Sequence, residues 1–188
     1  CMVQQEHVAQ KIKEKFPFVD LVGGTQSLGR FPELLEKARI SPRTVLALET
    51  GEERENLPIK RGHRIKAWVP ISHGCSNFCS YCIVPYVRGA EKSRPPENII
   101  NEVKDLVDKG YKEITLLGQN VNSYGRGLKE NIDFADLLHT LDRLEGRFLI
   151  RYMTSHPRDF SEKIIRTIQQ GQKICEHFHL PLQSGSDN

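Results

Sequence analysis

Three closely spaced cysteines constrain this chain of 188 residues more than any other feature. Cys75, Cys79 and Cys82 form a C-x-x-x-C-x-x-C pattern, with no fourth cysteine near them. Structural zinc sites and ferredoxin-type clusters ordinarily use four protein ligands. Three thiolates on one loop can instead hold three irons of a 4Fe–4S cluster and leave the fourth iron open to a substrate or cofactor. A disulfide, or a zinc site whose fourth ligand is remote, is the alternative interpretation.

The part of the chain around and after the cysteines has the rhythm of a parallel α/β fold. Strands are predicted at residues 65–72, 113–117, 147–153 and 177–182, and helices at residues 96–109, 134–144 and 162–170. Strands that alternate with helices in this way form a parallel sheet, and ligands bind at the carboxyl ends of its strands. The cysteines directly follow the first of these strands. The four predicted strands are too few to close an eight-stranded barrel.

The residues before this part predict a second, smaller α/β domain. Helices are expected at residues 3–15 and 27–38, with Ser27 as an N-cap, and strands at residues 18–22 and 44–48. The polar, proline-containing stretch that follows is typical of a linker. We therefore predict a domain at residues 1–50, a linker at residues 51–64 and a second domain at residues 65–188.

The composition limits which partners the protein can bind and in which cellular compartment it is expected. The net charge of +3 permits an RNA partner without requiring one. The sequence has no apolar run long enough to span a membrane and no signal peptide. Five cysteines, an odd number with three clustered, argue against a disulfide framework and favour a reducing, cytoplasmic location. Because the chain begins at Cys1 and ends soon after a predicted strand, we expect an internal fragment of a longer protein.

Polar residues after the other strands are further candidate contacts. Gly118, Gln119 and Asn120 supply a flexible backbone and two amides after the second strand, and Gln183 follows the fourth. They are candidate cofactor contacts, although a plain polar turn is an equally good interpretation of the first three. Three basic residues after the cysteines can meet the anionic ends of a substrate or RNA phosphates, or form a solvated turn: Arg88, Lys92 and Arg94.

The histidines and the remaining cysteine are weaker candidates. His156, His177 and His179 lack the spacing of a metal site. The latter two are expected to pack in the sheet or to bond to a cofactor. Cys175 is expected to be a small buried residue.

The cysteine spacing, with the aromatic Tyr81 just before Cys82, is similar to the signature of the radical S-adenosylmethionine (SAM) superfamily. The resemblance implies that the open iron chelates the amino and carboxylate groups of SAM and that Tyr81 packs near the adenine. It also implies that one electron from the cluster splits the sulfonium to give a 5′-deoxyadenosyl radical, which abstracts hydrogen from unreactive carbon. The protein then supplies orientation and excludes water.

Motifs along most of the chain resemble one branch of that superfamily, the methylthiotransferases, and most of all the MiaB family. These motifs are the cysteine loop with Ile83–Tyr86, the run at residues 88–95, and the segments at residues 115–122, 154–157 and 179–186. The resemblance implies a tRNA methylthiotransferase that inserts sulfur and a methyl group at carbon 2 of N(6)-dimethylallyladenosine next to the anticodon. It implies two 4Fe–4S clusters and SAM as cofactors. The implied partners are the tRNA anticodon loop and an electron donor such as flavodoxin or ferredoxin. A sibling methylthiotransferase with another substrate, or a non-catalytic Fe–S or RNA-binding fragment, is the alternative.

The resemblance also implies a role for Cys1. In these proteins the third cysteine of an N-terminal domain lies in a Gly-Cys-Met/Val-x-Gln context, which the residues from Cys1 to Gln5 match. Cys1 is therefore implied to be a ligand of a second, auxiliary cluster whose other two cysteines lie upstream. The implied fold is a partial radical SAM (β/α) barrel preceded by the C-terminal part of an α/β methylthiotransferase N-terminal domain. The fragment alone is expected to be inactive.

Overall fold

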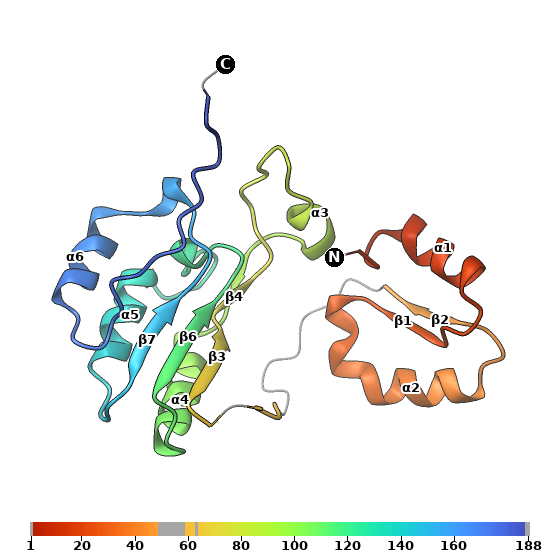
Figure 1. Ribbon diagram of the computed structural model, residues 1–188, viewed down its shortest axis with the longest axis horizontal. Helices are drawn as coiled ribbons and strands as arrows, with labels where there is room; N and C mark the ends of the chain where they lie inside the picture. Colours follow the sequence, from red (N-terminus) through yellow and green to blue (C-terminus); the bar gives the residue numbers. More distant parts are fainter. Residues whose placement is uncertain (1, 49–58, 63, 187–188) are drawn as a thin grey trace. The chain divides into compact units, whose positions relative to one another are not determined.

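In the computed structural model, which describes residues 2–48, 59–62 and 64–186, the chain forms two compact units (Figure 1). The smaller unit comprises Cys1–Lys60 with Asn77–Gly89, and the larger comprises Arg61–Ser76 with Ala90–Asn188. The predicted linker at residues 51–64 lies mostly outside the described residues, and the predicted domain limits stay predictions. No helix in the described ranges is long and apolar enough to cross a membrane.

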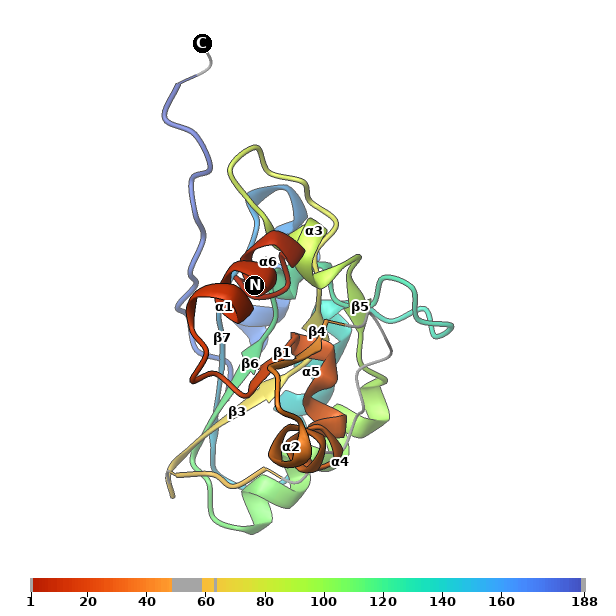
Figure 2. The ribbon, with the colours of Figure 1, turned by 90° about the vertical axis from the view of Figure 1, so that its right-hand side faces the viewer.

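The smaller unit is built around a parallel strand pair. β1 (Leu21–Gly23) pairs with β2 (Val45–Ala47), and α2 (Phe31–Ile40) connects them after the 3₁₀ helix η1 (Thr25–Arg30). Parallel neighbours need a crossover of this kind, because a tight turn cannot join them. The helix α1 (Glu6–Lys15) precedes the pair (Figure 2), and the short α3 (Val84–Arg88) belongs to the same unit.

The predicted order of elements in this unit is confirmed, but two boundaries are wrong. The first strand begins at Leu21 rather than at residue 18, and Phe18 is 77% exposed. Ser27 is not the N-cap of α2, because it lies inside η1 and its Oγ donates to the carbonyl of Gly24 at 2.7 Å. The helix begins at Phe31 with a proline in its first turn, where the missing amide of proline leaves no helical hydrogen bond unmade.

A three-stranded parallel sheet forms the centre of the larger unit. Its strands lie in the order β3 (Lys66–Pro70), β6 (Glu113–Leu117) and β7 (Leu149–Tyr152). The helices that follow the strands are α4 (Pro96–Asp108), α5 (Phe134–Asp142) and α6 (Glu162–Gln170) (Figure 1). A short antiparallel pair, β4 (Ser72–His73) and β5 (Lys92–Ser93), stands before and after the cysteine loop in the sequence. The predicted α/β class with parallel strands is confirmed.

The helices of this unit cover one face of the sheet. Alternate strand residues share one apolar core with residues of all three helices: Ala67, Val69, Ile114, Leu116, Ile150, Ile99, Val103, Leu137, Leu141, Ile164 and Ile168. The strand residues in between point to the other face. There, Lys66 and Arg151 each pair with Glu113 at 3.2 Å, and Trp68 is about half exposed. One face of the sheet is therefore closed by helices, and the other carries charged and exposed side chains.

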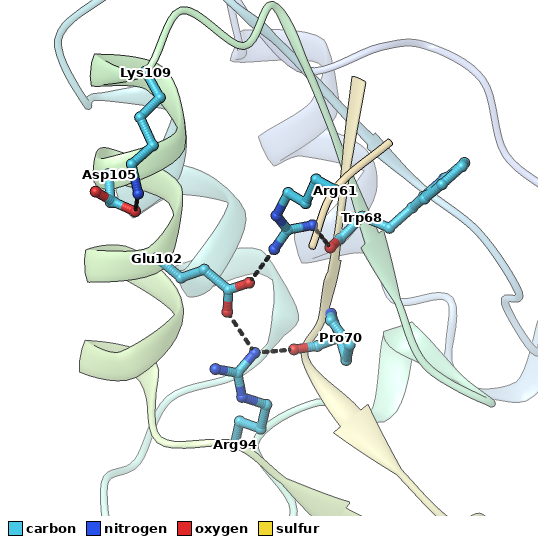
Figure 3. Close-up of polar contacts among 7 residues, drawn as sticks. All are labelled: Arg61, Trp68, Pro70, Arg94, Glu102, Asp105 and Lys109. Carbon is cyan, nitrogen blue, oxygen red and sulfur yellow. Dashed lines mark hydrogen bonds and ion pairs between the residues drawn. The ribbon is translucent and has the colours of Figure 1, made fainter. Parts of the chain in front are cut away.

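Two arginines cap the outer edge of β3 (Figure 3). Arg61 donates to the carbonyl of Trp68 at 2.7 Å, and Arg94 donates to the carbonyl of Pro70 at 2.5 Å. Both guanidinium groups pair with Glu102 of α4, at 2.6 and 2.9 Å. These bonds satisfy carbonyls on a sheet edge and tie α4 to β3. Because Arg94 is nearly buried in this network, the structure makes it a structural cation rather than a solvated turn residue or an RNA contact.

The last predicted strand is wrong. Residues 177–182 form no strand, and the only further bridge to β7 in the described chain is an isolated parallel one between Ile174 and Ile150. Pro181 lacks the amide that a strand ladder uses. His177 and His179 are exposed and so do not pack in the sheet. By contrast, β6 and α6 match their predicted limits, because strong periodicity and clear end signals coincide there.

Candidate functional site

The cysteine loop begins directly after β4. Cys75 is buried, and Cys79 and Cys82 are half-buried. The amide of Cys82 donates to the carbonyl of Cys79 at 2.9 Å, so these two residues share one turn. Within the described part of the chain, all four cysteines carry thiols rather than disulfides, and thiols are what metal ligation requires.

The donor set fits an iron–sulfur cluster by its chemistry. Thiolates are the soft ligands that hold such clusters, and three of them lie on one loop. Among the residues that the structure describes, no three His, Cys, Asp or Glu side chains are arranged to hold a metal ion as they stand. The three cysteines are therefore a candidate ligand set by residue type and spacing.

Buried polar atoms without hydrogen-bond partners follow the carboxyl ends of the three parallel strands. Within the described ranges they are Ser72 Oγ after β3, Gln119 Oε1, Asn120 Oδ1 and both amide atoms of Asn122 after β6, and Ser155 Oγ after β7. Buried polar groups in proteins are nearly always paired with protein or with water. Unpaired groups at this end of a parallel sheet fit a polar ligand, since this is where such sheets bind theirs.

Gly118 leaves room for the side-chain hydroxyl of Ser72, which lies in the segment after β3. A Cβ at this position would lie 2.5 Å from Ser72 Oγ, closer than non-bonded atoms come. The structure therefore brings the predicted contacts Gly118, Gln119 and Asn120 beside the residues that lead into the cysteine loop. A side chain at position 118 would force the hydroxyl of Ser72, one of these unpaired buried groups, to rotate away.

Asn120 also belongs to a charged network. Its Nδ2 donates to Asp159 Oδ2 at 2.6 Å, and Arg126 Nη2 pairs with Asp159 Oδ1 at 2.6 Å. Burial raises the pKa of Asp159, but the bond from Asn120 and the charges of Arg126 and Arg158 outweigh it and hold the pKa below its ordinary value. The loop after β6 is thus fixed to the 3₁₀ helix η3 (Pro157–Asp159) after β7. Asn120 Oδ1 stays available as an acceptor.

Glu91 is a candidate site residue that the sequence did not indicate. Its side chain is 3% exposed, and neither carboxyl oxygen receives a hydrogen bond from a described group. Arg126 Nη1 lies 3.9 Å away, beyond hydrogen-bond range. Burial raises the pKa of Glu91, and Ser123 and Arg126 offset only part of this rise. In the sequence Glu91 stands among basic residues and looks solvated, so only the packing reveals it.

The remaining residues predicted to contact a cofactor or a cluster are Tyr81, Gln183 and Cys1. Tyr81 is largely exposed, so its ring is open to a ligand. Gln183 has a φ of 74°, in the left-handed region that few side chains adopt. Cys1 lies outside the described residues.

The remaining candidates have local structural roles. His156 caps η3, because its Nδ1 accepts a hydrogen bond from the amide of Arg158 at 3.2 Å. Cys175 is half-buried rather than buried, and its carbonyl accepts a hydrogen bond from the hydroxyl of Tyr152 at 3.4 Å. Burial, together with Cys175, raises the pKa of Tyr152.

The chain is similar to a known protein family and to several named proteins. A family model described as the Radical SAM superfamily matches residues 69–188. A protein of Natranaerobius thermophilus is 55% identical over 100% of this chain and 42% of its own length. A protein of Moorella thermoacetica is 55% identical over 100% of this chain and 43% of its own length. A protein of Desulforamulus reducens is 51% identical over 100% of this chain and 41% of its own length.

Each of these relatives is named tRNA-2-methylthio-N(6)-dimethylallyladenosine synthase, which confirms the predicted resemblance. The chain spans about two fifths of the length of these relatives. The residues matched by the family model include the cysteine loop, the parallel sheet and the polar strand ends. This family uses a 4Fe–4S cluster and SAM, and the three thiols and the unpaired polar groups suit them. The chain belongs to the radical SAM superfamily.

Proposed function

We propose that this chain is the part of a tRNA methylthiotransferase that holds the radical-forming cluster and SAM. The relatives that match it from end to end are named as synthases of 2-methylthio-N(6)-dimethylallyladenosine in tRNA. The proposed substrate is therefore N(6)-dimethylallyladenosine next to the anticodon, whose carbon 2 receives the methylthio group. An unpaired loop base suits this chemistry, because it can be turned out of its stack and read.

The observation that carries the proposal is the set of unpaired polar groups at the strand ends. Gln119 Oε1, Asn120 Oδ1 and Asn122 Oδ1 are buried hydrogen-bond acceptors without donors among the described residues. SAM offers the matching donors, which are an ammonium group, ribose hydroxyls and an adenine amine. A protein that merely stored a cluster would need the thiolates but not these acceptors.

The proposed roles follow the chemistry of each residue. Cys75, Cys79 and Cys82 hold the cluster as thiolates, and Tyr81 lies against the adenine of SAM. Further contacts to SAM come from the strand-end loops: Gly118, Gln119, Asn120 and Gln183. When bound, the cluster and SAM supply radical chemistry at unreactive carbon. The chain itself supplies orientation, because Gly118 leaves room for the hydroxyl of Ser72 and Asp159 fixes Asn120.

The wider architecture is also part of the proposal. Helices on one face of a parallel sheet support a partial (β/α) barrel, since doubly wound sheets carry helices on both faces. Residues 1–50 are then the C-terminal part of the N-terminal domain, in which Cys1 helps to hold an auxiliary cluster. The partners are the tRNA anticodon loop and a flavodoxin- or ferredoxin-type electron donor in the cytoplasm.

The complete protein that contains this chain tests the proposal. After anaerobic reconstitution it receives SAM, a reductant and tRNA with N(6)-dimethylallyladenosine, and mass spectrometry measures the nucleosides. We expect both 5′-deoxyadenosine and the methylthiolated nucleoside. Cys1→Ala should keep the first product and lose the second, because it removes only an auxiliary ligand, whereas Cys175→Ala should keep both. Deoxyadenosine without methylthiolation by the unsubstituted protein would indicate another substrate, and neither product would indicate a non-catalytic protein.

A further inference from the structure

Phe78 is held in an unusual backbone conformation in the cysteine loop. Its φ is 44°, in the left-handed region that bulky side chains avoid. The side chain is 61% exposed, so burial of the ring does not offset the strain. Strained residues of this kind occur preferentially at binding sites and active sites. The conformation of Phe78 therefore points to a binding role for its exposed ring.

Tyr86 of α3 lies against Phe78. The two ring centroids are 5.7 Å apart and the ring planes meet at 81°, which is an edge-to-face pair. Pro85 and Val87, the neighbours of Tyr86 in α3, are buried, whereas Tyr86 is 73% exposed. The two rings therefore orient one another while both remain open to solvent.

The sequence on either side of this pair favours an anionic partner. The sequence from Ile65 to Ala90 contains no Asp or Glu. Arg88 belongs to the same short helix as Tyr86. Exposed aromatic rings beside cations are what single-stranded nucleic acid binds, because bases stack on the rings and phosphates pair with the cations.

We propose that Phe78 and Tyr86 form a stacking platform for an unpaired base of an RNA loop. The inference rests on the proposed function and deepens it, because it names a surface with which this chain itself holds RNA. It is separate from the role of Tyr81, whose proposed ligand is the adenine of SAM. One ring of the platform stands between two cysteines of the loop and the other follows the third, so a stacked base is held by the segment that carries the cluster ligands.

The chain offers a matched control in a second exposed edge-to-face pair. The rings of Phe16 and Phe18 lie 5.8 Å apart at 71°, and Phe18 is also largely exposed. Glu14 and Asp20 stand near this pair in the sequence together with Lys13 and Lys15, so its surroundings are of mixed charge, whereas residues 65–90 contain no acidic residue. Phe18→Leu therefore removes a comparable exposed ring without touching the proposed surface.

The test measures binding of a synthetic hairpin RNA by the complete, reconstituted protein. The hairpin loop carries 2-aminopurine, whose fluorescence is quenched when it stacks, and all variants are compared at equal iron content. We expect Phe78→Leu and Tyr86→Leu each to weaken binding about tenfold and to reduce the quench, because each removes a stacking ring. Tyr86→Phe keeps the ring and should bind normally, as should Phe18→Leu.

Unchanged affinity in both platform variants would overturn the inference. An equal loss in Tyr86→Phe and Tyr86→Leu would also overturn it, because the hydroxyl and not the ring would then matter. If the Phe78 and Tyr86 variants bind the RNA normally but bind a protein reductant more weakly, the pair is a protein-binding surface and the inference is wrong. If the unsubstituted protein fails to bind the hairpin, the proposed function itself fails, so the two failures are distinguishable.

Discussion

The hydroxyl of Ser72 lies against the backbone of Gly118, 2.5 Å from the point where a side chain on residue 118 would begin. A side chain on residue 118 would therefore force this hydroxyl out of its position. The loop after β3 leads to the cysteines, and the loop after β6 carries two amides with unpaired buried oxygens. Ser72 and Gly118 thus lie together within the larger unit, shortly before Cys75 and Gln119 in the sequence.

Gly118→Ala should therefore weaken SAM binding by the complete, reconstituted protein about tenfold or more, since small displacements in a binding site are costly. Equilibrium dialysis with SAM measures the effect. Gly62→Ala is the matched control, because no atom of the described residues lies within 4 Å of a Cβ added there.

A second substitution shows whether the clash is the cause. With Ser72→Ala in place, the nearest described atom to a Cβ at position 118 is Val121 Cγ1 at 3.5 Å, an ordinary contact. Gly118→Ala should then add little to the effect of Ser72→Ala alone. Fully additive losses in the double variant would show that the close approach is not what limits binding.

Glu102→Gln should destabilise the larger unit by about 2 kcal/mol or more, because it leaves two nearly buried guanidinium groups without their shared carboxylate. Urea denaturation measures the change. Asp105→Asn is the matched control on the same helix, since its pair with Lys109 is exposed and is worth about 0.5 kcal/mol or less (Figure 3). Equal losses in the two variants would contradict a structural role for the Arg61–Glu102–Arg94 network.

The buried carboxyl of Glu91 should make the stability of the fold depend on pH, and the direction of this dependence follows from its raised pKa. Burial raises the pKa of Glu91 in the folded protein above its ordinary value of 4.5, so the folded protein keeps this proton to higher pH than the unfolded chain. The resulting stability is fully present below pH 4.5 and is lost as the pH rises through the folded pKa. Glu91→Gln should therefore gain stability relative to the unsubstituted protein as the pH rises toward neutrality. A Glu91→Gln effect that shrinks with rising pH would contradict the burial of this carboxyl.

Periodicity and end signals made much of the fold predictable. The helix α6 has Ser161 as its N-cap, and α4 ends before Gly110, whose φ of 89° suits the end of a helix. Ser27 was misassigned because a hydroxyl that can cap a helix can equally bond to a nearby carbonyl, here that of Gly24. The strand at residues 177–182 was misassigned because local apolar pattern does not show whether a neighbouring strand is there to pair with it.

The sequence predicts the cysteines and the loop from Gly118 to Asn120 as candidate site residues, because spacing and position after a strand carry their signal, and their roles stay predictions. Glu91 and Asn122 were not predicted, because an unpaired buried group is a property of the packing around it. The strain at Phe78 is likewise a backbone property that residue type does not reveal. Sequence patterns thus predict a site at the carboxyl ends of the strands, and the packing adds further unpaired polar groups there.

The central claim is that Cys75, Cys79 and Cys82 hold a 4Fe–4S cluster with one iron open to SAM. Mössbauer spectroscopy of the complete, anaerobically reconstituted protein, with the auxiliary site disabled by Cys1→Ala, tests it most directly. The account predicts about four irons per chain in one cluster. SAM should change the signal of one iron site, and iron should be lost in Cys79→Ala but not in Cys175→Ala. Tightly bound zinc without iron uptake, or a cluster whose spectrum does not respond to SAM, would contradict the account.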